Sequence, residues 1–348
     1  MSQGTHESRS PSNDETTGKR AGPRLLLHLL LFIATFFTTT VAGVQWIGKN
    51  PFELTNLSYG LTYSFSILFV LGLHEFGHYF AARYHGVQVT LPYFIPFPPT
   101  PIFLNFGTLG AVIRTKVAVP SRKAMFDIGV AGPLAGFVAC TILLTIGFLT
   151  LPGPDFILSI HPKYDFLTNS TNESQGLPLE FGQTLIFRFL SWLLTNPSSQ
   201  FVPPMSEIYH YPFLCVGWFG LFVTAMNLIP IGQYDGGHLV YTLFGERHRI
   251  VSRTSFAVLL ALGLPSILDS ILREIISHFA QLYPDQIIPF AQYSWSGWFL
   301  WALISFYVVK LYHPPIEDES PLDPRRMLVG WITFAVFVLC FSFSPFTI

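Results

Sequence analysis

The chain has 348 residues, of which half are hydrophobic, 16% are aromatic and only 11% are charged. A soluble domain carries about 25% charged residues, so this composition excludes an ordinary soluble enzyme. It predicts an all-α polytopic protein embedded in a lipid bilayer. The net charge of -1 also argues against a nucleic-acid partner, because no basic stripe is present to neutralise phosphates.

The first predicted elements are a polar tail and an apolar helix. Residues 1–24 are polar and rich in Ser, Thr, Asp and Glu, which is typical of a disordered cytoplasmic tail. Residues 25–56 are expected to hold a first transmembrane helix and an external loop. The short, partly acidic N-terminal segment favours a bacterial plasma membrane over a plastid, because transit peptides are usually poor in acidic residues.

Long charge-free runs predict about seven transmembrane helices. In chain order they cover residues 25–47, 57–82, 127–151, 212–232, 254–272, 295–312 and 327–346. The fifth is the weakest, since its charge-free run ends at Asp269 and is short. We expect a catalytic membrane core at residues 57–240, followed by C-terminal transmembrane helices at 241–348.

The second predicted helix carries the sequence His74-Glu75-Phe76-Gly77-His78. Residues four apart share one face of a helix, so both imidazoles can point at one Zn²⁺ ion with Glu75 beside them. Two histidines and a carboxylate in or near lipid are costly unless they have a function. Glu75 is therefore predicted to act as the catalytic general base toward a water molecule.

Residues 90–118 are not a simple loop. Five prolines between Pro92 and Pro101 prevent a regular helix, and the run from Phe106 to Arg114 has the glycines and β-branched residues of a strand or hairpin. Because the segment is apolar, we predict a small re-entrant β element that lines the catalytic cavity. Its expected substrate-binding residues are Phe106, Gly107, Thr108, Leu109 and Gly110, since an exposed strand edge can bind an extended peptide.

The third predicted helix opens with Asp127, which is expected to cap it, and contains Gly132-x-x-x-Gly136. Such a glycine pair can mark a homodimer interface, but close packing inside the same chain is the favoured interpretation. Residues 152–211 follow as a long external loop. Within it, the apolar run from Phe181 to Leu194 is interrupted by Arg188 and predicts an interfacial helix.

A third zinc ligand has to come from elsewhere in the chain. Asp235, in the run from Asn227 to His238, follows the fourth predicted helix and enters the same side of the membrane as the histidines. Glycines next to Asp235 allow a close backbone approach. A turn or cap role for Asp235 and a zinc contact from His238 are the alternatives.

The basic residues predict the orientation in the membrane. If the N-terminus is cytoplasmic, 15 of the 19 Lys and Arg residues fall in cytoplasmic segments. Basic residues are enriched on that side of membrane proteins, so an N-terminus in the cytoplasm is expected. This topology puts His74 and His78 toward the cytoplasmic end of their helix.

Taken together, these motifs resemble those of the site-2 protease family of intramembrane zinc metalloproteases, in its PDZ-lacking bacterial and plastid-like subgroup. The matching pieces are His74-Glu75-x-x-His78, the run from Ala131 to Gly136, and Asn227-x-x-Pro230-x-x-x-x-Asp235-Gly236. The resemblance implies Zn²⁺ on His74, His78 and Asp235, Glu75 as the base, and a substrate or oxyanion contact from Asn227. The more common form of this family motif has a proline at the position where this chain has Leu228.

The expected function is hydrolysis of peptide bonds in transmembrane protein substrates, in regulated intramembrane proteolysis. One alternative is a membrane zinc protease that cuts soluble or lipidated peptides, although such enzymes usually take a downstream Glu as third ligand. Another is a non-catalytic membrane scaffold with a structural zinc site. The presence of Glu75 argues against the scaffold, because a structural site needs no base.

Overall fold

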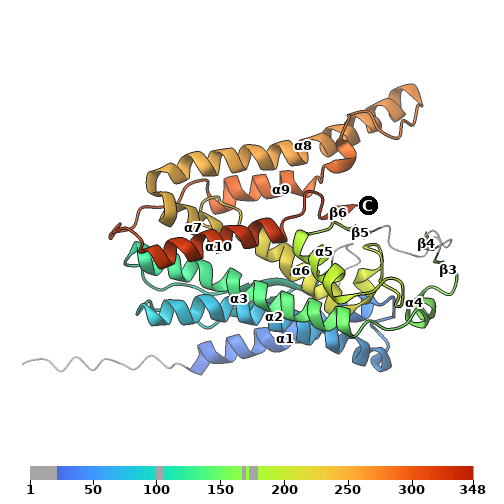
Figure 1. Cartoon of the computed structure of the whole chain (residues 1–348), viewed down its shortest axis with the longest axis horizontal. Coiled ribbons are helices and arrows are strands. Elements are labelled where there is room, and N and C mark those ends of the chain that lie inside the picture. Colours follow the sequence, from blue (N-terminus) through green and yellow to red (C-terminus); the bar gives the residue numbers. More distant parts are fainter. Residues whose placement is uncertain (1–21, 99–104, 167–169, 172–178, 348) are drawn as a thin grey trace, which may run out of the picture.

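The computed structural model of the chain describes residues 22–98, 105–166, 170–171 and 179–347. The predicted cytoplasmic tail lies almost wholly outside these residues. The described part is mostly helical, as the composition predicts, with three small two-stranded sheets. Its long helices run roughly parallel to the long axis of the molecule (Figure 1).

The centre of the molecule is built from four helices. They are α1 (Gly22–Trp46), α2 (Leu57–Tyr84), α3 (Arg122–Leu149) and α6 (Pro212–Asn227). α3 packs against both α2 and α6, and α1 covers the other side of α2. The main hydrophobic core draws on all four helices and includes the fully buried Trp218 and Leu144.

Within the part of the chain that the structure describes, four helical segments are long and apolar enough to cross a membrane: Leu25–Trp46, Leu54–Tyr84, Arg122–Leu149 and Asp235–Ala280. Seven spans are therefore not confirmed. The runs predicted at 212–232 and 295–312 form the shorter apolar helices Pro212–Asn227 and Gly297–Val309. At about 1.5 Å per residue, a helix of 16 residues reaches only about 24 Å, short of a hydrocarbon core of about 30 Å.

The proline-rich segment after α2 folds as the predicted hairpin. Strand β1 (Tyr93–Pro96) pairs antiparallel with β2 (Thr108–Val112), with an irregularity in register between Phe94 and Pro96. α1 packs along β1, and β2 contacts α2. Within the described residues no further strand pairs with β2, so the edge of β2 opposite β1 is not paired with another strand.

The long connection between α3 and α6 contains short elements rather than one loop. They are α4 (Asp155–Ile160), β3 (Tyr164–Asp165), β4 (Ser170–Thr171), β5 (Glu180–Phe181), α5 (Leu185–Leu194) and η2 (Ile208–His210). α5 lies within the run predicted to form an interfacial helix and begins where Thr184 accepts a hydrogen bond from the Phe187 amide. β3 pairs with β4, and β5 pairs with the C-terminal strand β6 (Phe346–Thr347).

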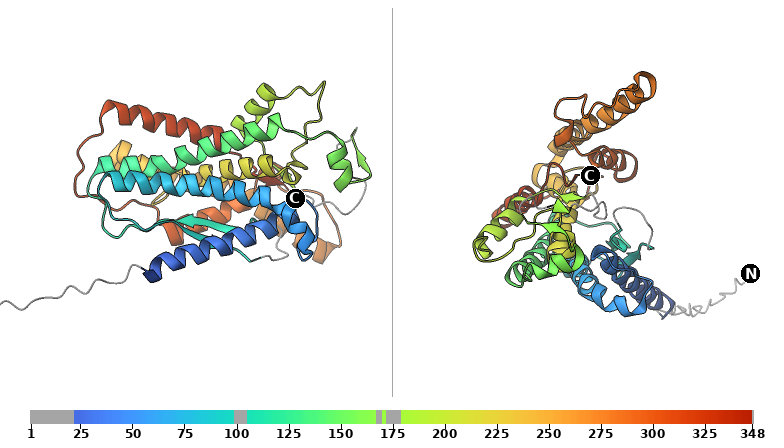
Figure 2. Two further views of the ribbon diagram at one scale, coloured as in Figure 1. Left: turned by 90° about the horizontal axis from the view of Figure 1, so that it is seen from below. Right: turned by 90° about the vertical axis from the view of Figure 1, so that its right-hand side faces the viewer.

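The C-terminal helices form a second group. They are α7 (Asp235–Phe244), α8 (His248–Ala280), α9 (Gly297–Ile304) and α10 (Pro324–Cys340). Besides η2, the helical elements of the described residues include the 3-10 segments η1 (Leu54–Asn56), η3 (Gly245–Arg247) and η4 (Ala291–Tyr293) and the π-helical turn η5 (Ser305–Val309). α7 and α10 pack against α3, whereas α8 packs mainly against α9 and extends away from the other helices (Figures 1 and 2).

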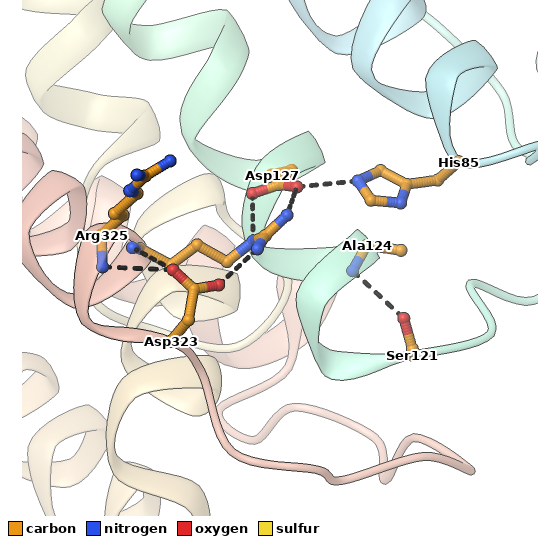
Figure 3. Close-up of polar contacts among 7 residues, drawn as sticks. His85, Ser121, Ala124, Asp127, Asp323 and Arg325 are labelled. Carbon is orange, nitrogen blue, oxygen red and sulfur yellow. Dashed lines mark hydrogen bonds and ion pairs between the residues drawn. The ribbon is translucent and has the colours of Figure 1, made fainter.

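The expected cap of α3 is not Asp127. Ser121 caps this helix, since its hydroxyl accepts a hydrogen bond from the Ala124 amide at 3.2 Å. The Asp127 carboxylate instead binds the Arg326 guanidinium of α10 at 2.6 and 2.9 Å and His85, directly after α2, at 2.8 Å (Figure 3). The sequence alone could not show this, because tertiary structure brings the distant side chains of His85 and Arg326 to the Asp127 carboxylate.

Candidate active site

α2 presents His74 and His78 on one face, four residues apart, as the helical spacing requires. Both side chains are buried, and so is the neighbouring Glu75. Their imidazole Nε2 atoms lie 3.1 Å apart. A buried pair of imidazoles that face each other this closely can supply two ligands of a cation site.

The candidate for a third ligand is Asp235, the first residue of α7. Its Oδ2 atom lies 3.6 Å from His74 Nε2 and 3.3 Å from His78 Nε2. The preceding turn is tight, with Gly232 at a φ of +55°. A Cβ at Gly236 would lie 2.0 Å from the Leu228 carbonyl oxygen, so only glycine lets α7 begin here.

The spacing of these three atoms fits Zn²⁺. Zinc binds imidazole nitrogen and carboxylate oxygen at about 2.0–2.2 Å in a tetrahedral arrangement, which places neighbouring ligand atoms about 3.3 Å apart. The observed separations of 3.1, 3.3 and 3.6 Å lie close to this value. Three protein ligands also leave the fourth position of a tetrahedron open, as in catalytic zinc sites.

His78 is held in orientation by another part of the chain, and a polar side chain of α6 lies beside His74. His78 Nδ1 donates to the Ile128 carbonyl of α3 at 2.7 Å, which directs Nε2 toward Asp235. The Asn227 side-chain nitrogen, at the end of α6, lies 3.2 Å from His74 Nε2. The fold therefore brings Asn227, expected from its motif to contact substrate, directly next to the three candidate ligands.

Glycines of α3 allow the close approach. A Cβ at Gly132 would lie 2.1 Å from His78 Nε2, and a Cβ at Gly136 would lie 3.1 Å from His74 Nδ1. A Cβ at Gly77 of α2 would meet the Ala131 carbonyl oxygen at 2.6 Å. The pair Gly132-x-x-x-Gly136 thus packs inside the chain, as favoured, against the histidines.

A cavity of about 450 Å³ opens beside the three candidate ligands. His74, Glu75 and Asn227 line one part of it, and apolar side chains of α2 and α6 form much of its remaining wall. β2 contributes all of its residues, Thr108 to Val112. An apolar cavity with a few convergent polar groups is the usual form of a ligand site.

Four of the five predicted substrate-binding residues of the hairpin line this cavity: Phe106, Thr108, Leu109 and Gly110. The exception is Gly107. It has a φ of +73°, accepts a hydrogen bond from the Thr38 hydroxyl of α1 at 2.6 Å, and packs against that helix. Gly107 therefore anchors the hairpin to α1 and does not line the cavity, and a substrate contact from it stays a prediction.

Glu75 is the only carboxylate in the cavity wall among the described residues. Its carboxylate approaches the backbone of Ile113, directly after β2. The side chain thus lies between the metal-ligand atoms and the edge strand. A base in this position can reach a water molecule next to the cation and a peptide bond that lies along β2.

His238 does not join the three candidate ligands. Its Nδ1 atom lies 2.7 Å from Nε2 of His313, which comes from the loop before α10. Burial, together with the nearby His238, lowers the pKa of His313 to about 4.

Two neighbours of the site were not predicted from the sequence. Sequence reasoning gave the loop that holds His313 no role near the site, and it also missed Trp301 of α9, which lines the cavity. Neither carries a motif that could have revealed it.

Several curated relatives of the chain are plant proteins. It is 26% identical over 243 residues to the probable zinc metalloprotease EGY2, chloroplastic, of Oryza sativa subsp. indica, which covers 69% of the chain and 40% of that relative. It is 28% identical to the probable zinc metalloprotease EGY1, chloroplastic, of Arabidopsis thaliana, over 58% of the chain and 33% of that relative. The chain thus spans well under half the length of these relatives.

These names bear on the predicted location. They fit the plastid-like subgroup, but they do not support a bacterial plasma membrane, which the composition of the N-terminal segment favoured. That segment lies outside the described residues.

The model of Peptidase family M50 matches residues 62–268, more than half of the chain. The matched region contains most of α2, the hairpin, α3, α6, α7 and part of α8, and so all three candidate ligands and Glu75. No solved structure gives a significant match. The match and the arrangement of His74, His78 and Asp235 agree, and the chain belongs to peptidase family M50, the site-2 protease family.

Proposed function

We propose that the protein is a zinc-dependent intramembrane metalloendopeptidase that hydrolyses peptide bonds of transmembrane protein substrates, in regulated intramembrane proteolysis. One observation carries the proposal. His74, His78 and Asp235 from two helices converge within 3.6 Å of one another, with Glu75 beside them at an apolar cavity. Family membership and the printed names of the plant relatives support it.

His74, His78 and Asp235 would hold the zinc ion. When bound, such an ion polarises a substrate carbonyl and lowers the pKa of water to about 7. Glu75 accepts a proton from the attacking water and returns it to the leaving amine. The Asn227 amide nitrogen, next to His74, is placed to donate a hydrogen bond to the carbonyl oxygen of the substrate as negative charge develops on it.

The free edge of β2 is the proposed binding strip for the substrate. Pro96 has no amide hydrogen, and its pair with Thr108 is flanked by the hydrogen bond from the Phe97 amide to the Gly107 carbonyl. In such a pair the backbone polar groups of Thr108 face away from β1. An extended substrate segment can pair there, which keeps its peptide bonds hydrogen-bonded after it unwinds from a helix.

The test is cleavage of a model transmembrane segment by the full chain in detergent or vesicles. Glu75→Gln should retain zinc and lower the cleavage rate about 10²–10⁴-fold, because the amide cannot accept the proton. Asp235→Ala should lose both zinc and cleavage. Cleavage by Glu75→Gln at the wild-type rate would reject Glu75 as the general base. Cleavage of soluble peptides alone would favour a membrane zinc protease that acts on soluble or lipidated peptides.

The position of the substrate can be tested without turnover. In the Glu75→Gln background, a cysteine at Leu109, whose side chain is exposed and lines the cavity, should form a disulfide with a cysteine in the substrate segment. Leu149→Cys is the matched control, since it is equally exposed at the far end of α3. The native Cys140, Cys215 and Cys340 are buried. Equal cross-linking at both positions would remove the strand-edge proposal.

A further inference from the structure

A second group of metal-binding side chains lies far from the first. His161, Glu207 and His210 come from the end of α4 and from η2, in the connection between α3 and α6. Glu207 and His210 are buried, and His161 is partly exposed.

α4 lies at the end of the molecule where α1 ends and α2 begins (Figures 1 and 2). His74 is 17 residues into α2, about 25 Å along that helix from its first residue Leu57. The two groups are therefore separate sites.

The geometry of this second group repeats that of the first. His161 Nε2 and His210 Nε2 lie 3.0 Å apart, and each lies 3.6 Å from Glu207 Oε2. These separations again match neighbouring corners of a zinc tetrahedron, about 3.3 Å apart.

The backbone orients this group as well. His210 Nδ1 donates to the Trp46 carbonyl at 2.8 Å, just as His78 Nδ1 donates to the Ile128 carbonyl. Each hydrogen bond leaves Nε2 free to face the other two ligand atoms.

Hydrogen bonding does not explain how the buried Oε2 atom of Glu207 is stabilised. Its side chain is 7% exposed, and its Oε2 atom has no hydrogen-bond partner. At 3.6 Å the two imidazole nitrogens are too far away to donate to this oxygen, since such bonds are about 2.7–3.2 Å long. A buried carboxylate oxygen without a donor is costly, and a cation between the three atoms would satisfy it.

From this arrangement we infer that His161, Glu207 and His210 form a second binding site for a divalent transition-metal cation of the Zn²⁺ class. Two imidazoles and one carboxylate are a donor set that suits zinc. Partly exposed His161 gives the ion a route from solvent. The bound ion would join α4 to η2 and, through the Trp46 carbonyl, hold both against the end of α1.

The second site shares no residue with the proposed active site, so counting bound zinc in variants distinguishes the two. The full chain, purified without a polyhistidine tag, is loaded with ZnCl₂, desalted and measured for zinc per protein. Wild type should hold two equivalents. His74→Ala/His78→Ala should hold one, and adding Glu207→Gln to that double variant should remove the last equivalent.

Single variants test the second site in the otherwise intact protein. Glu207→Gln and His161→Ala should each fall from two equivalents to one, and the retained equivalent shows that the protein is still folded. His278→Ala removes an exposed histidine of α8 and should keep two equivalents. With Co²⁺ as the probe, His74→Ala/His78→Ala should still show the visible absorption of a tetrahedral complex.

Two results would overturn the inference. One is a wild-type protein that holds a single equivalent, with Glu207→Gln unchanged. The other is a second equivalent that survives in both Glu207→Gln and His161→Ala, which would assign it to adventitious surface binding. One equivalent retained in His74→Ala/His78→Ala supports the second site, and the equivalent lost in that variant is assigned to the proposed active site.

Discussion

Single glycines on α3 decide how closely that helix approaches the two histidines of α2. Gly132 faces His78 and Gly136 faces His74, but the space at the two positions differs. A methyl group at Gly132 would overlap the atom of His78 that faces Asp235, whereas one at Gly136 would only be tight. Residue size here thus acts directly on the proposed zinc ligands.

We therefore predict that Gly132→Ala weakens zinc binding at this site by 10-fold or more. The added methyl group has to push the His78 ring out of position, and misplaced ligands cost affinity on this scale. Gly136→Ala is the matched control and should change affinity less than threefold. Competition with a zinc chelator measures both, and equal effects at the two positions would contradict the steric explanation.

The lowered pKa of His313 predicts how the stability of the protein changes with pH. Its pKa of about 4 in the folded protein lies below the usual 6.5, so the unfolded chain binds more protons between these values. Stability should therefore fall as pH drops from about 6.5 to 4, by at most about 3 kcal/mol from this group. The groups that face it are His238, Tyr241 and His248.

The variant His313→Asn should flatten this part of the stability profile, because the titrating imidazole is gone. Thermal unfolding in detergent at closely spaced pH values measures the slope. Substitution of the exposed His278 provides the comparison and should leave the slope as in wild type. An unchanged slope in His313→Asn would show that other groups control the acid sensitivity.

At the scale of elements, one ion-pair network joins three helices. Asp127 of α3 binds both His85, which follows α2, and Arg326 of α10, and Arg326 also binds Asp323, the N-cap of α10 (Figure 3). The Arg326 side chain is 27% exposed, so its charge is partly shielded from water. Such a network is worth more than an isolated surface pair.

We expect Arg326→Gln to lower the free energy of unfolding by about 1–3 kcal/mol, since it leaves Asp127 without its main cationic partner. Arg325→Gln is the control, because this neighbouring side chain is exposed and points away from the network in Figure 3. Denaturation in detergent compares the two. A loss of stability as large in Arg325→Gln would assign the effect to the helix terminus rather than to the network.

In the hairpin of β1 and β2, the sequence pattern predicts the strands, but contacts with another helix orient their residues. Prolines and glycines predicted irregular or extended backbone, and the strands formed. Contacts with α1, such as Thr38 to the Gly107 carbonyl, decided which residues face the cavity. The sequence pattern therefore could not show that Gly107, unlike its neighbours, contacts α1 and not the cavity.

At the scale of the whole molecule, the proposed zinc ion links two groups of helices. His74 and His78 belong to the central helices, whereas Asp235 begins the C-terminal group. An ion that binds only the folded state stabilises it, by about 4 kcal/mol when its free concentration is 1,000 times the dissociation constant. Zinc should thus hold α7 against α2 and α3.

Removal of zinc with a chelator should accordingly lower the melting temperature of the wild type by several degrees, and added Zn²⁺ should restore it. Asp235→Ala provides the reference in which the first site is already lost, so a smaller shift is expected there. The remaining shift would come from the second site at His161, Glu207 and His210. Identical shifts in wild type and Asp235→Ala would mean that the first site does not link the helices.

The orientation in the membrane and a homodimer remain predictions at this scale. The distribution of basic residues favours a cytoplasmic N-terminus. The glycine pair of α3 supplies no argument for a dimer, since it packs against α2 inside the chain.

The sequence by itself determined the membrane class, the helical pairing of His74 and His78, and the identity of Glu75 as their neighbour, because composition and helical spacing are local properties. It also indicated Asp235 through a motif. Tertiary structure decided that Asp235 reaches the histidines, that Trp301 lines the cavity, and that His161, Glu207 and His210 come together. Their separations along the chain follow no period, so only the packing of helices can bring such residues within a few ångströms.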